Sequence, residues 1–568
     1  METLSSLKIQ SWLTWFLRGM LIFGFLILAA RLVDLSIIRG NYFRSLAEGN
    51  RIRRFPIVAP RGNIFARGGE LIVGNKEVKL HLTFDSESGY QKLKDVEGVN
   101  DNEIIKENQR NYLSGETFAH ITGYLGEVSE QELGKIRAEC PEKGPRHLGA
   151  LVGRGGLEQE YDCLLTGIDG EELIEVDAMG KKVRTLGRKK PIPGSDLHTT
   201  IDFGLQMKVV ELMRGKKGAV VITDGSGEIL SLYSSPSYDP NVFVSNDADK
   251  ISQLLNDPDL PLFDRVISGK FHPGSVYKPL VVISALEEVV IDEDYTYEDT
   301  GQIVISTPYG NFSYKNWYFT QYGGVEGKIG LERALTRSTD TFFYKLGELT
   351  GVEKLTDWSN RFGLDQKTGV DLPGEIPGFV PSPEWKIKEK GERWFLGNTY
   401  HMSIGQGDLA LTPIGINNYI ATIASDAKHC KPKIINKEET NYFLNKFKSS
   451  DTQDFQCEDM DINKDSLNLV KKGMMGACAS GGTGFTFFDF EEKSKGVKVA
   501  CKTGTAETEN GEPHAWFTVF APVANPQIVA TVLVENGGEG SRVAGPPARE
   551  IFNYWFKLPT RTPSPAHE

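Results

Sequence analysis

The chain has 568 residues, of which 39% are hydrophobic and 25% are charged, and its formal net charge is −12. The length leaves room for about two to four domains, and the composition is ordinary for a globular protein. Because the charge balance is acidic, a general nucleic-acid binder is excluded and no nucleic acid is expected as a partner.

An apolar segment near the N-terminus covers 12–38, and 19–30 contains no charged residue. A membrane span needs about 20 residues, so 12–33 is long enough when Arg18 and Arg31 lie at the interfaces. The two alanines before Arg31 lack a clean Ala-x-Ala cleavage pattern. The segment therefore predicts an uncleaved anchor, and a cleaved signal peptide or a buried helix of a soluble protein are the alternatives.

The region 39–195 carries no recognisable catalytic motif and is predicted to be a mixed α+β spacer or docking domain. Apolar and polar residues alternate over 78–84 with the period of a half-buried strand. The polar stretch 101–110 predicts a loop or a short helix. Ser129 stands three residues before Glu132, and this capping-box pattern predicts a helix over 129–138.

Six cysteines occur without a Cys-x-x-Cys pair and without regular spacing: Cys140, Cys163, Cys430, Cys457, Cys478 and Cys501. The pattern predicts neither a disulfide framework nor a zinc site, and it does not indicate a redox compartment. His429 is adjacent to Cys430, and we interpret this pair as structural.

The pattern changes near 196. Two apolar strands surround an Asp-Gly turn within 218–232, which is a strong hairpin signal. The other predicted elements are a strand at 197–202, a helix at 203–213, helical stretches from 279 to about 361 and at 411–424, and strands at 497–504, 515–521 and 528–534. Sheet, helices and sheet in this order predict an α/β sandwich whose sheet joins both ends of the domain. Residues 558–568 predict a disordered tail.

Ser275 and Lys278 stand three residues apart where a Pro-Gly pair meets an apolar run, a pattern typical of a loop entering a buried helix. They therefore share one helical face. Lysine can take the proton of the serine if burial or another cation favours its neutral form, and the free N–H of Ser275 can bind an oxyanion. A lone Ser-x-x-Lys is weak, because about two are expected by chance in such a chain.

Two further motifs follow. Ser338-Thr339-Asp340 lies within a predicted helical region, 331–346, and offers a hydroxyl that relays a proton beside a carboxylate that orients it; a helix cap is the alternative. Lys502-Thr503-Gly504-Thr505 follows a predicted strand and offers positive charge, hydroxyls and a glycine that lets a substrate backbone approach. Lys502 would also bias Lys278 toward neutrality. An edge strand with a solvated lysine is the alternative here.

These three motifs, in this order, resemble the signature of penicillin-binding proteins and serine β-lactamases. From about Arg31 to Trp555 the chain resembles class B penicillin-binding proteins of the elongation type, the group called penicillin-binding protein 2. Further similar stretches are Ala59-Pro60-Arg61-Gly62, Gly156-Leu157-Glu158, Ser235-Pro236-Ser237-Tyr238-Asp239-Pro240-Asn241, Gly405-Gln406-Gly407 and His514-Ala515-Trp516-Phe517. Asp340 and Asp264 stand where the family often has Asn, and we attach no loss of function to either.

The resemblance implies four parts: a short cytoplasmic tail and anchor at 1–38, an elongated non-catalytic pedestal of the dimerisation type at 39–195, an α/β penicillin-binding transpeptidase domain at 196–557, and the tail. It implies a membrane-anchored D,D-transpeptidase that cross-links peptidoglycan during cell-wall elongation. The substrate would be a stem peptide ending in D-Ala-D-Ala, β-lactams would acylate the same serine, and no metal or organic cofactor would be required.

The resemblance also assigns roles to the motif residues. Lys278 deprotonates Ser275, which attacks the penultimate D-Ala carbonyl, and Ser338 relays a proton to the leaving amine with Lys502 nearby. Thr503 and Thr505 hold the terminal carboxylate, and Asp340 and Gly504 complete the binding residues. The N–H groups of Ser275 and Thr505 form the oxyanion hole. The alternatives are a D,D-carboxypeptidase or β-lactamase, and a silent scaffold or β-lactam sensor.

The implied partner is a SEDS-family glycan polymerase of the elongation complex. The implied location is the bacterial inner membrane, with a single span and an extracytoplasmic catalytic domain. Charge counting opposes this orientation, because Lys8 and Arg18 precede the apolar core while six arginines follow it: Arg31, Arg39, Arg44, Arg51, Arg53 and Arg54. We give the substrate argument more weight.

Overall fold

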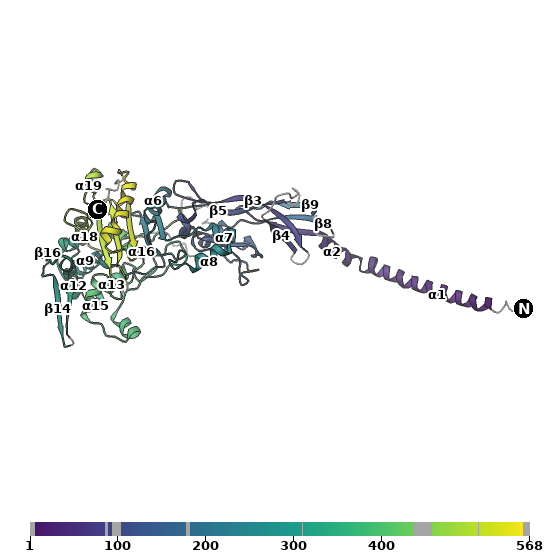
Figure 1. Ribbon diagram of the computed structural model, residues 1–568, viewed down its shortest axis with the longest axis horizontal. Helices are drawn as coiled ribbons and strands as arrows, with labels where there is room; N and C mark the ends of the chain where they lie inside the picture. The colour runs from purple at the N-terminus through teal and green to yellow at the C-terminus, as the bar shows by residue number, and fades with distance from the viewer. Residues whose placement is uncertain are drawn as a thin grey trace. The chain divides into compact units, whose positions relative to one another are not determined.

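The structure is a computed structural model that describes residues 6–85, 89–93, 104–177, 182–308, 310–436, 457–508 and 511–559. Its contacts define two compact units (Figure 1). The first unit comprises Met1–Pro60, Lys76–Gln109 and Gly167–Pro193, and the second comprises Arg61–Asn75, Arg110–Thr166 and Gly194–Glu568. The predicted domain boundaries remain predictions, and the predicted tail lies outside the described residues except for its first two positions.

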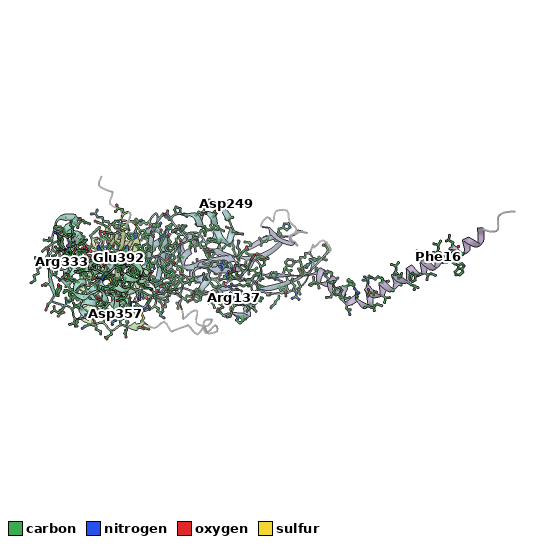
Figure 2. All side chains as sticks on the ribbon, turned by 90° about the horizontal axis from the view of Figure 1, so that it is seen from below. Phe16, Arg137, Asp249, Arg333, Asp357 and Glu392 are labelled. Atoms are coloured by element: carbon green, nitrogen blue, oxygen red, sulfur yellow. A yellow bond between two sulfur atoms is a disulfide. The ribbon has the colours of Figure 1, made fainter. Side chains whose placement is uncertain are left out.

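The apolar N-terminal segment forms one long helix. Helix α1 (Ser6–Val33) continues into a π-helical turn, η1 (Asp34–Ile38), and is followed by α2 (Gly40–Arg51). The segment Trp12–Ile38 has a hydropathy of 2.3 and none of it is buried, and Figure 2 shows Phe16 projecting from this helix. By length and composition it can cross a membrane, as predicted.

Antiparallel strands follow in the first unit. Strands β1 (Ile52–Ile57), β8 (Gly170–Val176) and β9 (Lys182–Lys189) form one sheet in that order. Arg54 and Arg184 form ion pairs with Glu171 and Glu175 across neighbouring strands, at 3.3 and 2.7 Å. Such cross-strand pairs of opposite charge favour this register.

The strand predicted at 78–84 is confirmed, because it lies within β3 (Leu71–Asp85), which pairs with β4 (Gly89–Leu93). The interpretation of 101–110 as a loop or short helix is wrong, because Ile104–Tyr112 forms strand β5 beside β3. The sequence of this polar segment lacks the alternation of apolar and polar residues that is typical of a strand. Pairing with β3 stabilises it as a strand nevertheless.

The helix predicted over 129–138 does not form, although the local contact that suggested it does. Ser129 donates from its backbone N and from Oγ to Glu132 Oε2, both at 2.9 Å. Glu132 also accepts from Arg154 at 2.6 Å and from Arg146 at 3.0 Å. These arginines hold the segment in a turn, so tertiary ion pairs override the capping pattern.

A five-stranded antiparallel sheet in the order β12-β11-β21-β20-β19 forms the centre of the second unit. Its strands are β11 (Gly218–Thr223), β12 (Ile229–Ser235), β19 (Ala500–Ala506), β20 (His514–Ala521) and β21 (Ile528–Val534). This confirms the hairpin, the late strands and the sheet that joins both ends of the domain. The strand predicted at 197–202 is shorter, with β10 covering only Leu197–His198.

Helices cover both faces of this sheet (Figure 1). Side chains such as Val220 pack with α6 (Phe203–Met213) and α21 (Gly545–Trp555). The alternate side chains, such as Val221, pack into the core that contains α9 (Lys278–Glu287), α16 (Pro413–Ala424) and α18 (Lys464–Cys478). The strands are buried on both faces, which explains why their sequences are continuously apolar.

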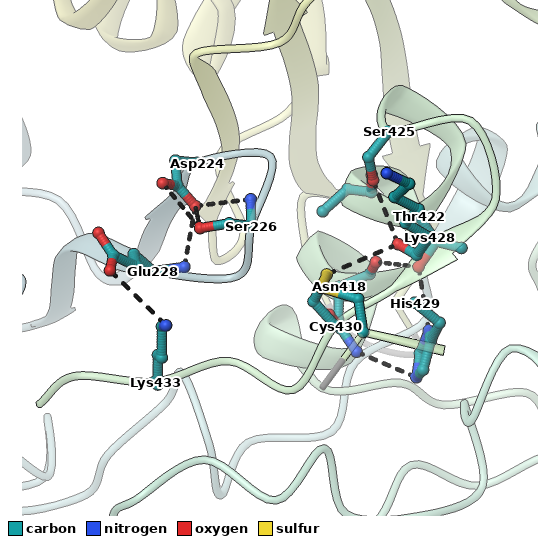
Figure 3. The surroundings of a disulfide bond; sticks show 12 residues. Asp224, Ser226, Glu228, Asn418, Thr422, Ser425, Lys428, His429, Cys430 and Lys433 are labelled. Carbon is teal, nitrogen blue, oxygen red and sulfur yellow. Dashed lines mark hydrogen bonds and ion pairs between the residues drawn. A yellow bond between two sulfur atoms is a disulfide. The ribbon is translucent and has the colours of Figure 1, made fainter. Parts of the chain in front are cut away.

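The prediction of no disulfide framework is wrong, because all six cysteines are paired: Cys140–Cys163, Cys430–Cys457 and Cys478–Cys501. The partners are 23 to 27 residues apart and meet only through the fold, so no local spacing reveals them. Figure 3 shows the surroundings of Cys430, where the neighbouring His429 contacts Thr422 at 3.0 Å and Asn418 at 3.4 Å. The contacts of His429 support its structural interpretation.

The disulfide Cys478–Cys501 joins the end of α18 to β19, one residue before Lys502. Replacing both cysteines with serine is expected to lower the unfolding free energy by about 3 kcal/mol, because the crosslink closes a loop of 23 residues in the unfolded chain. Melting curves measure the effect, with the exposed Ala479→Ser as the control. Unchanged melting in the double variant would contradict it.

Candidate active site

Ser275 lies in the tight turn η5 (Gly274–Tyr277), which leads directly into α9. Gly274 has a φ of +56° and donates from its N–H to the Gly405 carbonyl at 2.8 Å. A Cβ on Gly405 would lie 2.1 Å from the Gly274 carbonyl oxygen, so only glycine allows this approach. The turn therefore fixes Ser275 at the helix start, as predicted.

Lys278 is fully buried and makes three polar contacts with the second motif. Its Nζ donates to Asp340 Oδ1 at 2.6 Å, to the Ser338 carbonyl at 2.8 Å and to Ser338 Oγ at 3.1 Å. The ring of Phe343 lies 4.9 Å from the same atom. Among the described residues, no hydrogen bond joins Lys278 to Ser275 in this state.

The helical region predicted over 331–346 is confirmed, but it is divided into two helices at Ser338. Helix α11 (Leu331–Arg337) ends at Ser338, whose φ of +56° is left-handed, and α12 begins at Asp340 and runs to Thr350. A left-handed non-glycine residue costs about 1–3 kcal/mol and is characteristic of functional sites. The break places the Ser338 hydroxyl and the Asp340 carboxylate around the same lysine.

Lys502 enters the site from strand β19, and its side chain is fully buried. Its Nζ donates to Ser338 Oγ at 2.9 Å and to the Thr503 carbonyl at 3.0 Å. Ser338 Oγ therefore lies between the side-chain nitrogens of two lysines from different elements. A hydroxyl that both donates and accepts can pass a proton between them.

The remaining residues of the third motif lie next to the serine turn. Thr503 Oγ1 donates to Thr483 Oγ1 at 2.9 Å, and Thr505 Oγ1 accepts from the Gly540 N–H at 3.3 Å. Gly504 packs closely against η5, where a Cβ would lie 3.0 Å from the Pro273 carbonyl oxygen and from Val276 Cγ1. This packing leaves little room for a side chain at position 504.

Burial lowers the pKa of Lys278, and the carboxylate of Asp340 raises it in opposition. Burial also lowers the pKa of Lys502 well below its usual value, and the positive charge of Lys278 lowers it further. The pair with Asp340 opposes loss of the proton from Lys278, whereas burial and the charge of Lys278 disfavour the charged form of Lys502.

No sequence motif pointed to three residues that support the site. Asn316 Oδ1 accepts from the backbone N–H of Asp340 at 3.2 Å, and the N–H of Trp317 donates to Asp340 Oδ2 at 2.9 Å. Thr483 supports Thr503 as described above. Asn316 and Trp317 lie more than 20 residues from Asp340 in the chain, so only the fold reveals their contact.

Two family descriptions match this chain. The penicillin-binding protein transpeptidase domain matches residues 218–553, and the penicillin-binding protein dimerisation domain matches residues 85–199. The first match contains all three motifs and covers more than half of the chain.

Curated relatives align along nearly the whole chain. The peptidoglycan D,D-transpeptidase MrdA of Acinetobacter baumannii is 30% identical, with 96% of this chain and 88% of the relative covered. The protein of the same name from Escherichia coli K12 is 29% identical, with coverage of 99% and 96%.

Solved structures agree. Pseudomonas aeruginosa PBP2 in complex with WCK 5153 is 30% identical, covers 90% of this chain and 100% of that one, and has a TM-score of 0.69. The complex of PBP2 and MreC from Helicobacter pylori is 26% identical, with coverage of 89% and 99% and a TM-score of 0.71. The chain thus belongs to the penicillin-binding proteins, in the elongation-type group of D,D-transpeptidases called penicillin-binding protein 2.

Proposed function

We propose that this protein is a membrane-anchored peptidoglycan D,D-transpeptidase that cross-links stem peptides through an acyl-serine intermediate during cell-wall elongation. The observation that carries the proposal is the Ser338 hydroxyl, which lies 3.1 Å from Lys278 Nζ and 2.9 Å from Lys502 Nζ beside the Ser275 turn. Three motifs far apart in the sequence thereby form one acid–base site. The relatives named peptidoglycan D,D-transpeptidase support the same activity.

Acylation begins with a proton transfer. Lys278 is charged in its pair with Asp340, so it must lose that proton before it can act as a base. Ser338 offers the path, because its hydroxyl receives the proton from Lys278 and passes one on to neutral Lys502. Neutral Lys278 then takes the proton of Ser275, and Ser275 Oγ bonds to the penultimate D-Ala carbonyl carbon.

The leaving group, the terminal D-Ala, receives a proton through the Ser338 hydroxyl. Ser338 gives its proton to the amine of the terminal D-Ala and regains one from Lys502. The N–H groups of Ser275 and Thr505 stabilise the oxyanion, and Thr503 and Thr505 hold the terminal carboxylate of the donor peptide. The amine of a second stem peptide then attacks the acyl-serine carbonyl carbon and loses a proton to Lys502 through Ser338. Ser275 Oγ leaves with a proton from Lys278, which completes the cross-link and frees the serine. β-Lactams acylate the same serine.

Three disulfides support an extracytoplasmic catalytic domain, because disulfides persist in oxidising compartments. This argument is independent of the arginine count after the anchor, which opposes that orientation. The protein therefore crosses the bacterial inner membrane once, with the catalytic domain outside the cytoplasm. A SEDS-family glycan polymerase is its partner in the elongation complex, and the Helicobacter pylori relative that is seen with MreC supports membership of a wall-synthesis complex.

A product assay tests the reaction. Detergent-solubilised full-length protein is expected to convert lipid-linked or dimeric stem-peptide substrate into cross-linked product, with one terminal D-Ala released per bond. A hydrolase would release D-Ala without cross-links, because water would take the acyl group. Mass spectrometry of the products separates the two. Tetrapeptide products alone, from protein and polymerase together, would favour the carboxypeptidase alternative.

A further inference from the structure

A buried network lies behind the catalytic lysine and begins at Asp299, the last residue of strand β13 (Thr296–Asp299). Asp299 is 1% exposed, and its carboxylate accepts four hydrogen bonds. Oδ1 accepts from Thr341 Oγ1 at 2.6 Å and from the Gly301 N–H at 2.9 Å. Oδ2 accepts from the Glu326 N–H at 2.8 Å and from Asn316 Nδ2 at 3.2 Å. Among the described residues, no lysine or arginine forms an ion pair with it.

The Asp299 carboxylate determines the orientation of Asn316, which is fully buried. An ionised carboxylate only accepts hydrogen bonds, so Asn316 must turn its Nδ2 toward Asp299. Its Oδ1 then faces the other way and accepts from the backbone N–H of Asp340 at 3.2 Å. A buried amide placed between an acceptor and a donor in this way has one satisfied orientation.

The peptide unit that follows Asn316 holds the Asp340 side chain. The Trp317 N–H donates to Asp340 Oδ2 at 2.9 Å, and the opposite oxygen, Oδ1, lies 2.6 Å from Lys278 Nζ. Asn316 and Trp317, which are consecutive in the chain, thus bind the backbone and the carboxylate of Asp340, respectively. Ion-pair energy changes steeply with distance in a low-dielectric interior, so a small displacement of this carboxylate alters how firmly Lys278 keeps its proton.

We propose that Asp299 and Asn316 are positioning residues for acylation: they hold Asp340 against Lys278 and thereby set the pH at which Lys278 becomes a base. The inference rests on the proposed function, which makes Lys278 the base. Neither residue touches the reacting atoms. They act only through Asp340, on α12, and neither belongs to any of the three motifs.

Among the described residues, other groups also lie near Lys278 or Asp340. Lys502 approaches from β19 through Ser338 Oγ, the ring of Phe343 lies beside the ammonium group, and Tyr344 lies near Asp340. Asp340 is the anion paired with Lys278, and its carboxylate raises the pKa of Lys278 against the effect of burial. The same carboxylate also raises the pKa of Lys502. Loosening Asp340 therefore lowers the pKa of both lysines, and the acid limb of the acylation rate moves to lower pH.

The experiment measures the second-order rate of acylation by a fluorescent penicillin between pH 5 and 10 for full-length wild type, Asn316→Ala and Asp299→Asn. We expect the acid limb of both variants to move down by at least about 0.5 pH unit, with a lower plateau. The shift caused by Asn316→Ala should vanish in an Asp340→Asn background, because that background lacks the carboxylate through which Asn316 acts. The four proteins form a double-mutant cycle. Asn311→Ala, an exposed asparagine on β15 (Gly310–Lys315), is the matched control.

Folded variants whose acid limb stays at the wild-type pH would overturn the inference, even if their plateau falls. Failure of both variants to fold would overturn it as well, because their role would then be in the stability of the domain. An additive shift in the Asp340→Asn background would assign their effect to another group. Wild type that shows no acylation at any pH would instead count against the proposed function, since Lys278 would then not act as a base at all.

Discussion

Ser275→Ala is expected to abolish the covalent band that the wild-type protein forms with a fluorescent penicillin. The η5 turn fixes Ser275 at the start of α9, and the other hydroxyl on that turn, that of buried Tyr277, is hydrogen-bonded to Ser359 Oγ at 2.7 Å. Ser338, the serine of the second motif, is hydrogen-bonded to the side-chain nitrogens of both lysines, where its hydroxyl serves as the proton relay rather than the nucleophile. Loss of the nucleophile removes the acyl bond itself, so the expected decrease in labelling is complete rather than graded.

Gel fluorescence after denaturation measures the band, and the melting curve confirms that the variant is folded. Ser313→Ala, an exposed serine on β15, is the matched control and should label like wild type. Full labelling of folded Ser275→Ala would show that the nucleophile is assigned wrongly. No band in folded wild type would favour a scaffold, or an enzyme whose site stays closed until its partner binds.

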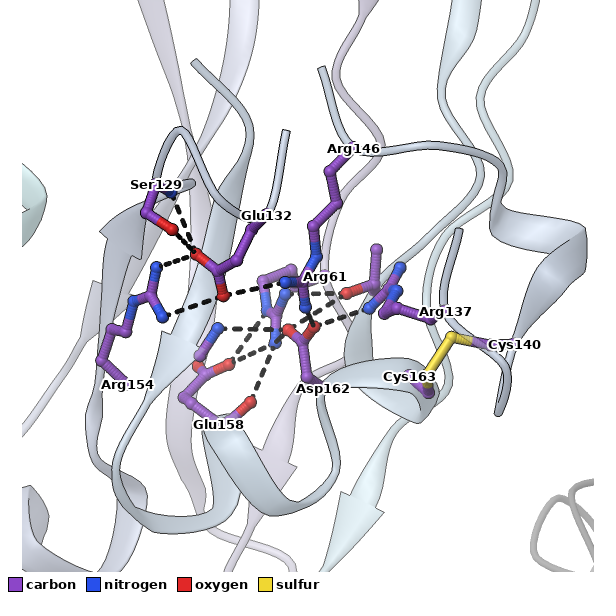
Figure 4. A network of polar contacts seen from close by, with 12 residues as sticks. Arg61, Ser129, Glu132, Arg137, Cys140, Arg146, Arg154, Glu158, Asp162 and Cys163 are labelled. Atoms are coloured by element: carbon purple, nitrogen blue, oxygen red, sulfur yellow. Dashed lines mark hydrogen bonds and ion pairs between the residues drawn. A yellow bond between two sulfur atoms is a disulfide. The ribbon is translucent and has the colours of Figure 1, made fainter. Parts of the chain in front are cut away.

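Glu158→Gln is expected to cause the largest loss of stability in the second unit. Glu158 is fully buried in helix α4 (Gly156–Glu160) and neutralises two buried arginines. Figure 4 shows it beside one of them, Arg61. Its Oε2 lies 2.8 Å from Arg61 Nη2, and its Oε1 lies 2.6 Å from Arg110 Nε. Removing one partner of a buried pair leaves an uncompensated charge, which costs about 3–5 kcal/mol.

Arg61 keeps its ion pair with Asp162 at 2.9 Å in the variant. Arg110 instead loses its neutralising charge, and its guanidinium keeps the hydrogen bond to the Gly62 carbonyl at 2.7 Å. We expect the melting temperature to fall by at least about 5 °C. Glu160→Gln, on the exposed side of the same helix, is the matched control and should melt like wild type. Equal melting of Glu158→Gln and the control would mean that the cluster contributes no net stability.

Elements whose local sequence pattern is sufficient to specify them were predicted well. The hairpin of β11 and β12 and the strands β20 and β21 appear within a few residues of the predicted positions, because continuous apolar runs bounded by turns leave a buried strand as the consistent interpretation. Helix α6 coincides with its predicted range. The Ser275 turn also followed from local pattern, since proline and glycine ahead of an apolar run specify where a helix begins.

Elements that depend on partners distant in the chain were missed. Strand β5 exists because β3 lies beside it, and the turn at Ser129 exists because two arginines hold Glu132. The break at Ser338 carries no glycine or proline to mark it. Each of these is a case in which tertiary contacts outweigh propensities of a few tenths of a kcal/mol per residue.

The sequence by itself determined the family, the anchor segment and the three motifs, because residue types at fixed spacings specify chemistry and local conformation. Only the tertiary structure decided which cysteines pair, which lysine pairs with Asp340 and which residues hold Asp340. Charge state and pairing depend on distances between atoms from separate elements. Those distances are set when α9, α12 and β19 pack around one buried hydroxyl.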